Sequence, residues 1–210
     1  MRKEDLNRIM KYKNNDPFIR IFDFLRFCLK EEAQEPASLE DMDWDELYAF
    51  GNKQAILGVL FHGIKKLSDS PHRPNKQQIL KWYAACSFIE QANRQAYKDA
   101  SALTTLLQEK YGVHGCVLKG QTNALMYPDP YMRTSGDIDL WTDAKTLDII
   151  RISRQLDPKG EIGYHHIELS YFKTPVEVHF FPSFMGNVWH EYKLRKFFEQ
   201  CKKEQFKHQT

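Results

Sequence analysis

The sequence predicts an α+β protein, in which an all-helical N-terminal region precedes a small sheet backed by helices. Apolar residues recur at helical spacing through most of residues 1–111. One such pattern, at residues 75–111, runs for roughly 35 residues, or about 55 Å of helix. After residue 112, short segments instead alternate between apolar and polar residues, as β-strands with one buried face do. We therefore expect a helical region at 1–111 and an α/β domain at 112–210.

The long helical segment has recognisable ends. Asn75 is a candidate N-cap, and Gly112 follows the last apolar residues as a C-terminal stop. Its apolar side chains recur at helical spacing: Ile79, Trp82, Tyr83, Cys86, Ile89, Ala92, Ala96, Ala100, Leu103, Leu106 and Leu107.

The α/β part begins with a short apolar strand, a Lys119-Gly120 turn and a short helix that Pro128 interrupts. Further along, Lys173-Thr174-Pro175 separates two alternating segments, which predicts a β-hairpin. The predicted elements are strands at 116–118, 137–140, 165–172 and 176–180, and helices at 121–127, 143–156 and 188–208, the last of them basic.

Composition restricts the class of protein. A hydrophobic content of 42% fits a packed globular chain, and a net charge of +2 gives no general affinity for nucleic acid. The four cysteines are isolated, as expected for reduced thiols in the cytoplasm. No apolar run approaches the roughly 20 residues of a membrane span. We expect a cytoplasmic protein without a membrane partner.

The residues that indicate chemistry are three carboxylates. In the segment Asp137-Ile138-Asp139-Leu140, a strand places Asp137 and Asp139 on one side and the two aliphatic side chains in the core. Glu177 repeats the pattern between two valines on the return strand of the hairpin. Like charges held together repel, so a fold that gathers these acids is expected to supply a cation.

Oxygen ligands favour Mg²⁺ or Mn²⁺ as that cation. No zinc site is expected, because histidines and cysteines at the usual ligand spacing are not evident. His179 fits either a packed side chain or a group beside the metal. His165 and His166 are adjacent, and alternation predicts that their side chains face opposite ways.

Four segments resemble the uncharacterised nucleotidyltransferase family of the DNA polymerase beta-like superfamily. They are Leu118-Lys119-Gly120, Tyr127-Pro128-Asp129-Pro130, the stretch from Arg133 to Leu140, and Val176-Glu177-Val178-His179. The resemblance implies a polymerase beta-like core with a small mixed sheet. It makes Gly120 the turn glycine, Asp137 and Asp139 the metal-binding pair, and Glu177 the third acid. Gln121 departs from the wider superfamily, in which a serine follows the turn glycine.

The implied activity is transfer of a nucleoside monophosphate from an NTP to a hydroxyl of an unidentified acceptor (a small molecule, a protein or an RNA end), with release of pyrophosphate. Asp137, Asp139 and Glu177 would be the catalytic and metal-binding residues of a two-metal mechanism using Mg²⁺ or Mn²⁺. Lys119, Gly120, Arg133 and Ser135 would bind the nucleotide phosphates.

Three alternatives stay open. The domain could bind a nucleotide or a partner protein without turnover. A metal-dependent glycosyltransferase also uses an Asp-x-Asp motif to hold a nucleotide-sugar, although the strand-poor first half of the chain disfavours that fold. Family members continue with more helices after the core, so a third alternative is that this chain is truncated at its C-terminus.

Overall fold

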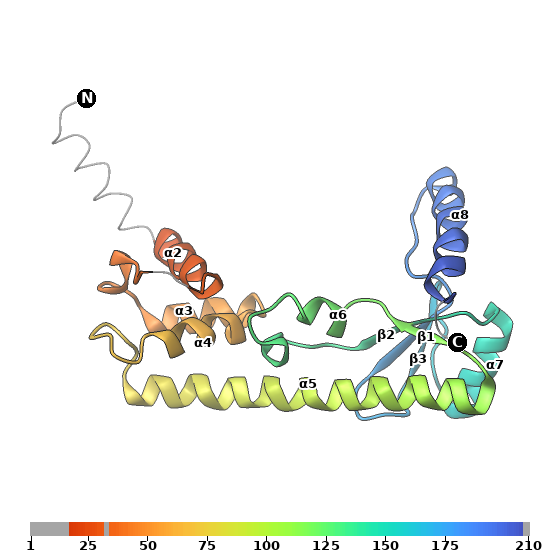
Figure 1. The fold of residues 1–210 in the computed structure, drawn as a ribbon, viewed down its shortest axis with the longest axis horizontal. Helices are drawn as coiled ribbons and strands as arrows, with labels where there is room; N and C mark the ends of the chain where they lie inside the picture. The colour runs from red at the N-terminus through yellow and green to blue at the C-terminus, as the bar shows by residue number, and fades with distance from the viewer. Residues whose placement is uncertain (1–16, 32–33, 208–210) are drawn as a thin grey trace. The chain divides into compact units, whose positions relative to one another are not determined.

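The structure, a computed structural model, describes residues 17–31 and 34–207 (Figure 1). Parts of the predicted helical region, residues 1–16 and 32–33, and the last predicted helical residue, 208, lie outside the described residues. The elements are α2 (Pro17–Leu29), η1 (Ala37–Leu39), α3 (Trp44–Lys53), α4 (Leu57–Lys66), α5 (Lys76–Tyr111), β1 (Gly115–Val117), α6 (Gln121–Ala124), η2 (Pro130–Met132), β2 (Ile138–Thr142), α7 (Thr146–Leu156), β3 (His166–Leu169), β4 (Val176–His179) and α8 (Val188–Gln205).

The chain divides into two compact units. The first comprises Met1–Gln91 with Ala124–Thr134, and the second comprises Ala92–Asn123 with Ser135–Thr210. Each unit has its own cluster of buried apolar side chains. Helix α5 contributes its first part to one cluster and its last part to the other.

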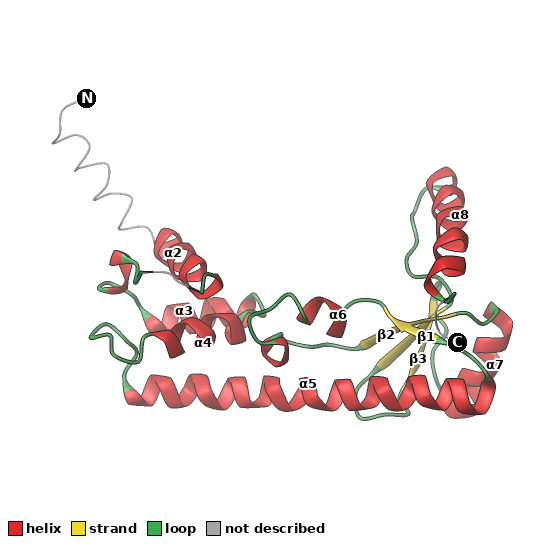
Figure 2. Cartoon of the chain, in the orientation of Figure 1, coloured by secondary structure: helices red, strands yellow, loops and turns green. Residues whose placement is uncertain are grey.

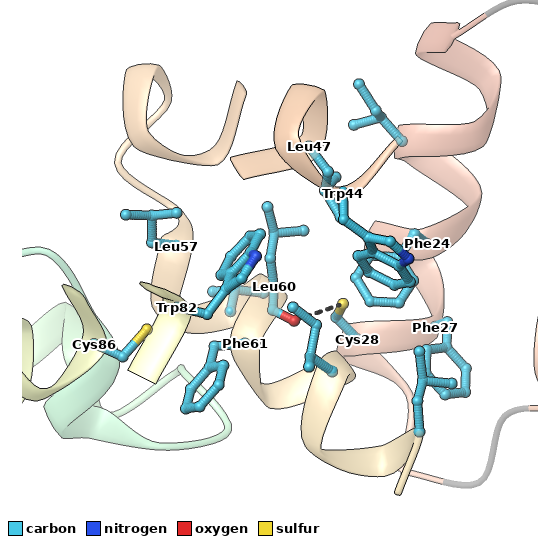
Figure 3. Close-up of a cluster of buried hydrophobic side chains, with 14 of the residues drawn as sticks. Phe24, Phe27, Cys28, Trp44, Leu47, Leu57, Leu60, Phe61, Trp82 and Cys86 are labelled. Carbon is cyan, nitrogen blue, oxygen red and sulfur yellow. Dashed lines mark hydrogen bonds between the residues drawn. The ribbon is translucent and has the colours of Figure 1, made fainter. Parts of the chain in front are cut away.

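The first unit is helical, and its core is rich in aromatic rings (Figure 3). Phe24 of α2 meets Trp44 of α3 edge-on, with ring centroids 5.4 Å apart. Helices α2 and α4 pack closely because Gly63 has no side chain, and a Cβ there would collide with the Cys28 sulfur. Asp43 begins α3 by accepting hydrogen bonds from two backbone amides of the first turn.

The second unit is built on a mixed sheet (Figure 2). The sheet has four strands in the order β1-β2-β4-β3. The central strands β2 and β4 run parallel, and each edge strand pairs antiparallel with its neighbour. The predicted hairpin is therefore confirmed as β3 and β4.

One face of this sheet is the core of the second unit. Ile138 and Leu140 have no exposed surface, as the alternating pattern predicted. The other strand residues of this face are Ile167, Leu169, Val176 and Val178. They pack with Ile149 of α7 and with a stripe of α5 side chains: Ala96, Ala100, Leu103 and Leu107. The opposite face carries the polar residues of the same strands.

Helix α5 ends as the sequence predicts. Gly112 adopts a φ of +64°, a left-handed conformation that favours glycine. The amide of Val113 then donates to the Leu107 carbonyl at 3.1 Å, a bond that closes the last helical turn.

The fold class is confirmed: a small mixed sheet backed by helices follows an N-terminal helical region. Among the residues that the structure describes, no helix has the length and apolar character needed to cross a membrane.

Candidate active site

Acidic side chains form a row across three strands on the polar face of the sheet. Asp139 on β2 pairs in register with Glu177 on β4, and Glu177 pairs in register with Glu168 on β3. Because residues in register on neighbouring strands point to the same face, the three carboxyl groups project together. Two of the three predicted acids are thus brought side by side, and Glu168 is an addition that the sequence analysis missed.

Asp139 is the best shielded of these acids, with only 4% of its surface exposed. The Lys119 ammonium lies 2.7 Å from its Oδ1, and His179 Nε2 lies 3.0 Å from the same oxygen. Burial disfavours the ionised carboxyl, but the hydrogen bonds from His179 and Lys119 outweigh burial and lower the pKa of Asp139. The hydrogen bond to Asp139 in turn raises the pKa of Lys119.

His179 connects the two carboxylates. It is buried at 1% exposure, and its Nε2 also lies 3.3 Å from Glu177 Oε2. Its other ring nitrogen, Nδ1, lies 3.3 Å from the Phe181 carbonyl oxygen. One ligand atom each of Asp139, Glu177 and His179 lie within 4.8 Å of one another, which is a suitable arrangement of donors for a metal ion.

The adjacent histidines do not face opposite ways, so that prediction is wrong. His166 Nδ1 lies 3.4 Å from His165 Nε2, and both rings gather with His179. Alternation fails because β3 begins at His166 and leaves His165 outside the strand. The hairpin register pairs His166 with His179, and that register was the available signal for the cluster.

The remaining predicted site residues lie in loops. Asp137 immediately precedes β2 and is half-buried, and its charge helps to raise the pKa of Lys119. Gly120 is buried at the start of α6 with a φ of +62°, so the predicted turn does require glycine. Ser135 is half-buried in the loop before β2. Arg133 directly follows η2 and belongs to the first unit.

Helix α8 packs beside the same face of the sheet. Trp141, two residues after Asp139 on β2, makes edge contacts with Phe198 and Phe206 at centroid distances of 6.2 and 5.4 Å. Lys202 of α8 also donates to the Ala144 carbonyl at 3.0 Å. The predicted basic helix thus exists, and it is held to β2 by aromatic contacts.

A helical region followed by a mixed sheet that carries paired acids beside a glycine turn is consistent with the nucleotidyltransferase class that the sequence resemblance implies. A sequence model of the uncharacterised nucleotidyltransferase family matches residues 40–200, and the chain belongs to that family. The matched range includes helices of the first unit as well as the sheet. No curated protein and no solved structure matches the chain.

Proposed function

We propose that this chain transfers a nucleoside monophosphate from an NTP to a hydroxyl group of an acceptor and releases pyrophosphate. Membership of a nucleotidyltransferase family supports the general reaction class. The observation that carries the proposal is the register of Asp139 with Glu177 on two parallel strands, with His179 buried between their carboxyl groups.

The donor set suits a divalent metal ion. Carboxylate oxygens from Asp139 and Glu177 are the ligands that Mg²⁺ and Mn²⁺ prefer, and a buried anionic site needs compensating positive charge. Asp137, two residues before Asp139, would complete the set. Ions held by these residues would supply positive charge to the phosphates and lower the pKa of the attacking hydroxyl.

The residues themselves would position the reacting groups and move the proton. Glu177 remains partly exposed, with 25% of its side chain accessible, so an acceptor hydroxyl can approach it. We assign it as the group that takes the hydroxyl proton, directly or through water. His179 would hold both carboxylates in place through its Nε2.

Four residues would bind the phosphates. Lys119 supplies an exposed ammonium beside Asp139, and Gly120 allows the backbone to turn directly after it. Helix α6 has only four residues, so Lys119 rather than a helix dipole would supply most of the positive charge. Arg133 and Ser135 precede the acids in sequence and remain proposed phosphate ligands.

Asp137→Asn tests the proposal. Asp139 is less suitable, because its ion pair with Lys119 and its bond to His179 also stabilise the fold. Wild-type protein with Mn²⁺ and an NTP should show a raised melting temperature, and it should release pyrophosphate when an acceptor is supplied. The variant should lose both effects while its own melting temperature without ligands stays near the wild-type value.

Asp148→Asn, an exposed acid of α7, is the matched control and should behave as wild type. Stabilisation by NTP without pyrophosphate release, across varied acceptors, would favour a binding module. Stabilisation by nucleotide-sugars alone would favour a glycosyltransferase. Unchanged metal-dependent NTP binding by Asp137→Asn would refute the assigned site.

A further inference from the structure

We propose that His165, His166 and His179 form a second site, which binds a transition metal ion such as Zn²⁺. One ring nitrogen from each of the three histidines lies within 4.8 Å of the other two. The site shares His179 with the carboxylate cluster, and its other two ligands, His165 and His166, are imidazoles with no part in the proposed nucleotidyl transfer, so the inference does not depend on that reaction. It also revises the expectation, from the sequence, that the chain has no zinc site.

The arrangement of the rings supports a shared ion. With a Zn–N bond of about 2.0–2.1 Å, three imidazoles around one tetrahedral ion have ring centroids roughly 5 Å apart. In the structure, the centroid of His165 lies 4.6 Å from that of His166 and 5.1 Å from that of His179. The third separation, between His166 and His179, is 5.4 Å. The planes of the rings are inclined to one another by 83°, 50° and 56°, so the rings are not stacked.

The separation of the nitrogens agrees with this geometry. Two ligand atoms on a tetrahedral zinc ion are roughly 3.4 Å apart, given the same bond length. His165 Nε2 and His166 Nδ1 are 3.4 Å apart. They come from adjacent residues, which can share an ion here because His165 lies just outside the strand.

At His165 the environment favours the neutral imidazole, the form that binds metals. Burial, followed by the neighbouring His166 and His179, lowers the pKa of His165.

A carboxylate lies against the cluster. Glu177 Oε2 is 3.6 Å from His166 Nδ1 and 3.3 Å from His179 Nε2. A carboxylate next to ligating histidines orients them and compensates the charge of the ion. Three imidazoles would discriminate against Mg²⁺, which prefers oxygen, and the two sites would therefore select different metals.

Co²⁺ is a suitable probe for Zn²⁺, because four-coordinate Co²⁺ with nitrogen ligands absorbs visible light. The full chain, freed of metal by a chelator, should bind Co²⁺ with such absorption, and Zn²⁺ should displace it while excess Mg²⁺ should not. His165→Asn and, separately, His166→Asn should weaken binding at least about tenfold. Neither variant removes His179, which is too buried to replace safely.

The controls separate this site from the acids. His190→Asn, on exposed α8, should bind Co²⁺ as wild type does. Asp137→Asn should also retain Co²⁺, although it is predicted to lose Mn²⁺–NTP. Wild-type affinity in both folded histidine variants, or loss of Co²⁺ in Asp137→Asn alone, would overturn the three-histidine site. Circular dichroism establishes that each variant is folded.

Discussion

One carboxylate oxygen of Asp139 contacts two side chains, a lysine and a histidine. The Lys119 ammonium and His179 Nε2 both contact Oδ1, at 2.7 and 3.0 Å. The Lys119 ammonium therefore forms an ion pair with an oxygen that a divalent metal ion would also need as a ligand. Lys119 therefore has two opposed roles in the proposed site, since it competes with the metal for Asp139 and attracts phosphate.

Lys119→Met separates these roles. Without the ammonium, Asp139 should bind Mn²⁺ alone more tightly, by a few-fold, because the ion no longer displaces a bonded cation. Binding of NTP in the presence of Mn²⁺ should weaken, because a positive charge near the phosphates is lost. Titration of Mn²⁺ followed by its electron paramagnetic resonance signal, and a thermal shift with NTP, measure the two effects.

Lys193→Met, an exposed lysine of α8, is the matched control and should change neither measurement. If Lys119→Met changes both affinities in the same direction, the competing roles assigned to Lys119 are wrong.

Individual residues of the site were predictable where strand alternation applies. Ile138 and Leu140 are buried and Asp139 projects on the opposite face, as the pattern requires. The histidine cluster was not predictable in this way, because it depends on where β3 begins and on the hairpin register. Both depend on how the two strands of the hairpin pair, which the alternation within a single segment does not specify.

At the level of elements, one carboxylate ties a helix to the hairpin. Asp99 on α5 is 6% exposed and accepts hydrogen bonds from the Thr174 backbone amide at 2.9 Å and from Gln95 Nε2 at 2.8 Å. Thr174 lies in the turn between β3 and β4, so this contact positions the hairpin against α5. Although burial opposes ionisation, the bonds from Thr174 and Gln95 lower the pKa of Asp99.

Asp99→Ala should reduce the free energy of unfolding by about 1–3 kcal/mol at pH 7, because it leaves a buried amide without its acceptor. Because the pKa of Asp99 is lower in the folded protein, its stabilising effect is fully present when the pH is above the ordinary aspartate pKa of about 4. The effect is lost as the pH falls through the lower pKa of the folded state. The difference between wild type and variant should therefore shrink in acid. Urea unfolding at pH 7 and in acid measures both quantities.

Glu109→Ala, an exposed position on the same helix, should change stability by no more than about 0.5 kcal/mol. A difference for Asp99→Ala that stays constant with pH would show that the ionised carboxylate is not the source of the stabilisation.

Most elements follow from local signals. The pattern at 75–111 corresponds to α5 (Lys76–Tyr111), and Gly112 ends it as predicted. The mixed strand order was not accessible from periodicity, since the same alternation is compatible with parallel or antiparallel pairing. Only the resemblance to a known family implied a mixed sheet.

At the scale of the whole molecule, the two hydrophobic cores belong to different units, and the family match at residues 40–200 extends into both. The acids and histidines of the two proposed sites, Asp137, Asp139, Glu177, His165, His166 and His179, all lie in the second unit. We propose residues 112–210 as the nucleotide-binding domain and residues 1–111 as a helical region that binds the acceptor, although the compact units do not divide at residue 112: residues 92–111 of α5 pack in the second unit, and residues 124–134 belong to the first.

Hydrogen exchange measured by mass spectrometry tests this division in the intact chain. With Mn²⁺ and an NTP, slower exchange is expected at residues 115–142 and 166–181, because the ligand would order the turn at Gly120 and the strands that carry the acids. Helices α2 to α4 should exchange as in the free protein. With the same ligands, Asp137→Asn should show no slowing of exchange at residues 115–142 or 166–181. This control separates specific binding from general effects of metal and nucleotide on exchange. Protection centred on residues 17–66 would instead place the nucleotide on the helical region and contradict the proposed domains.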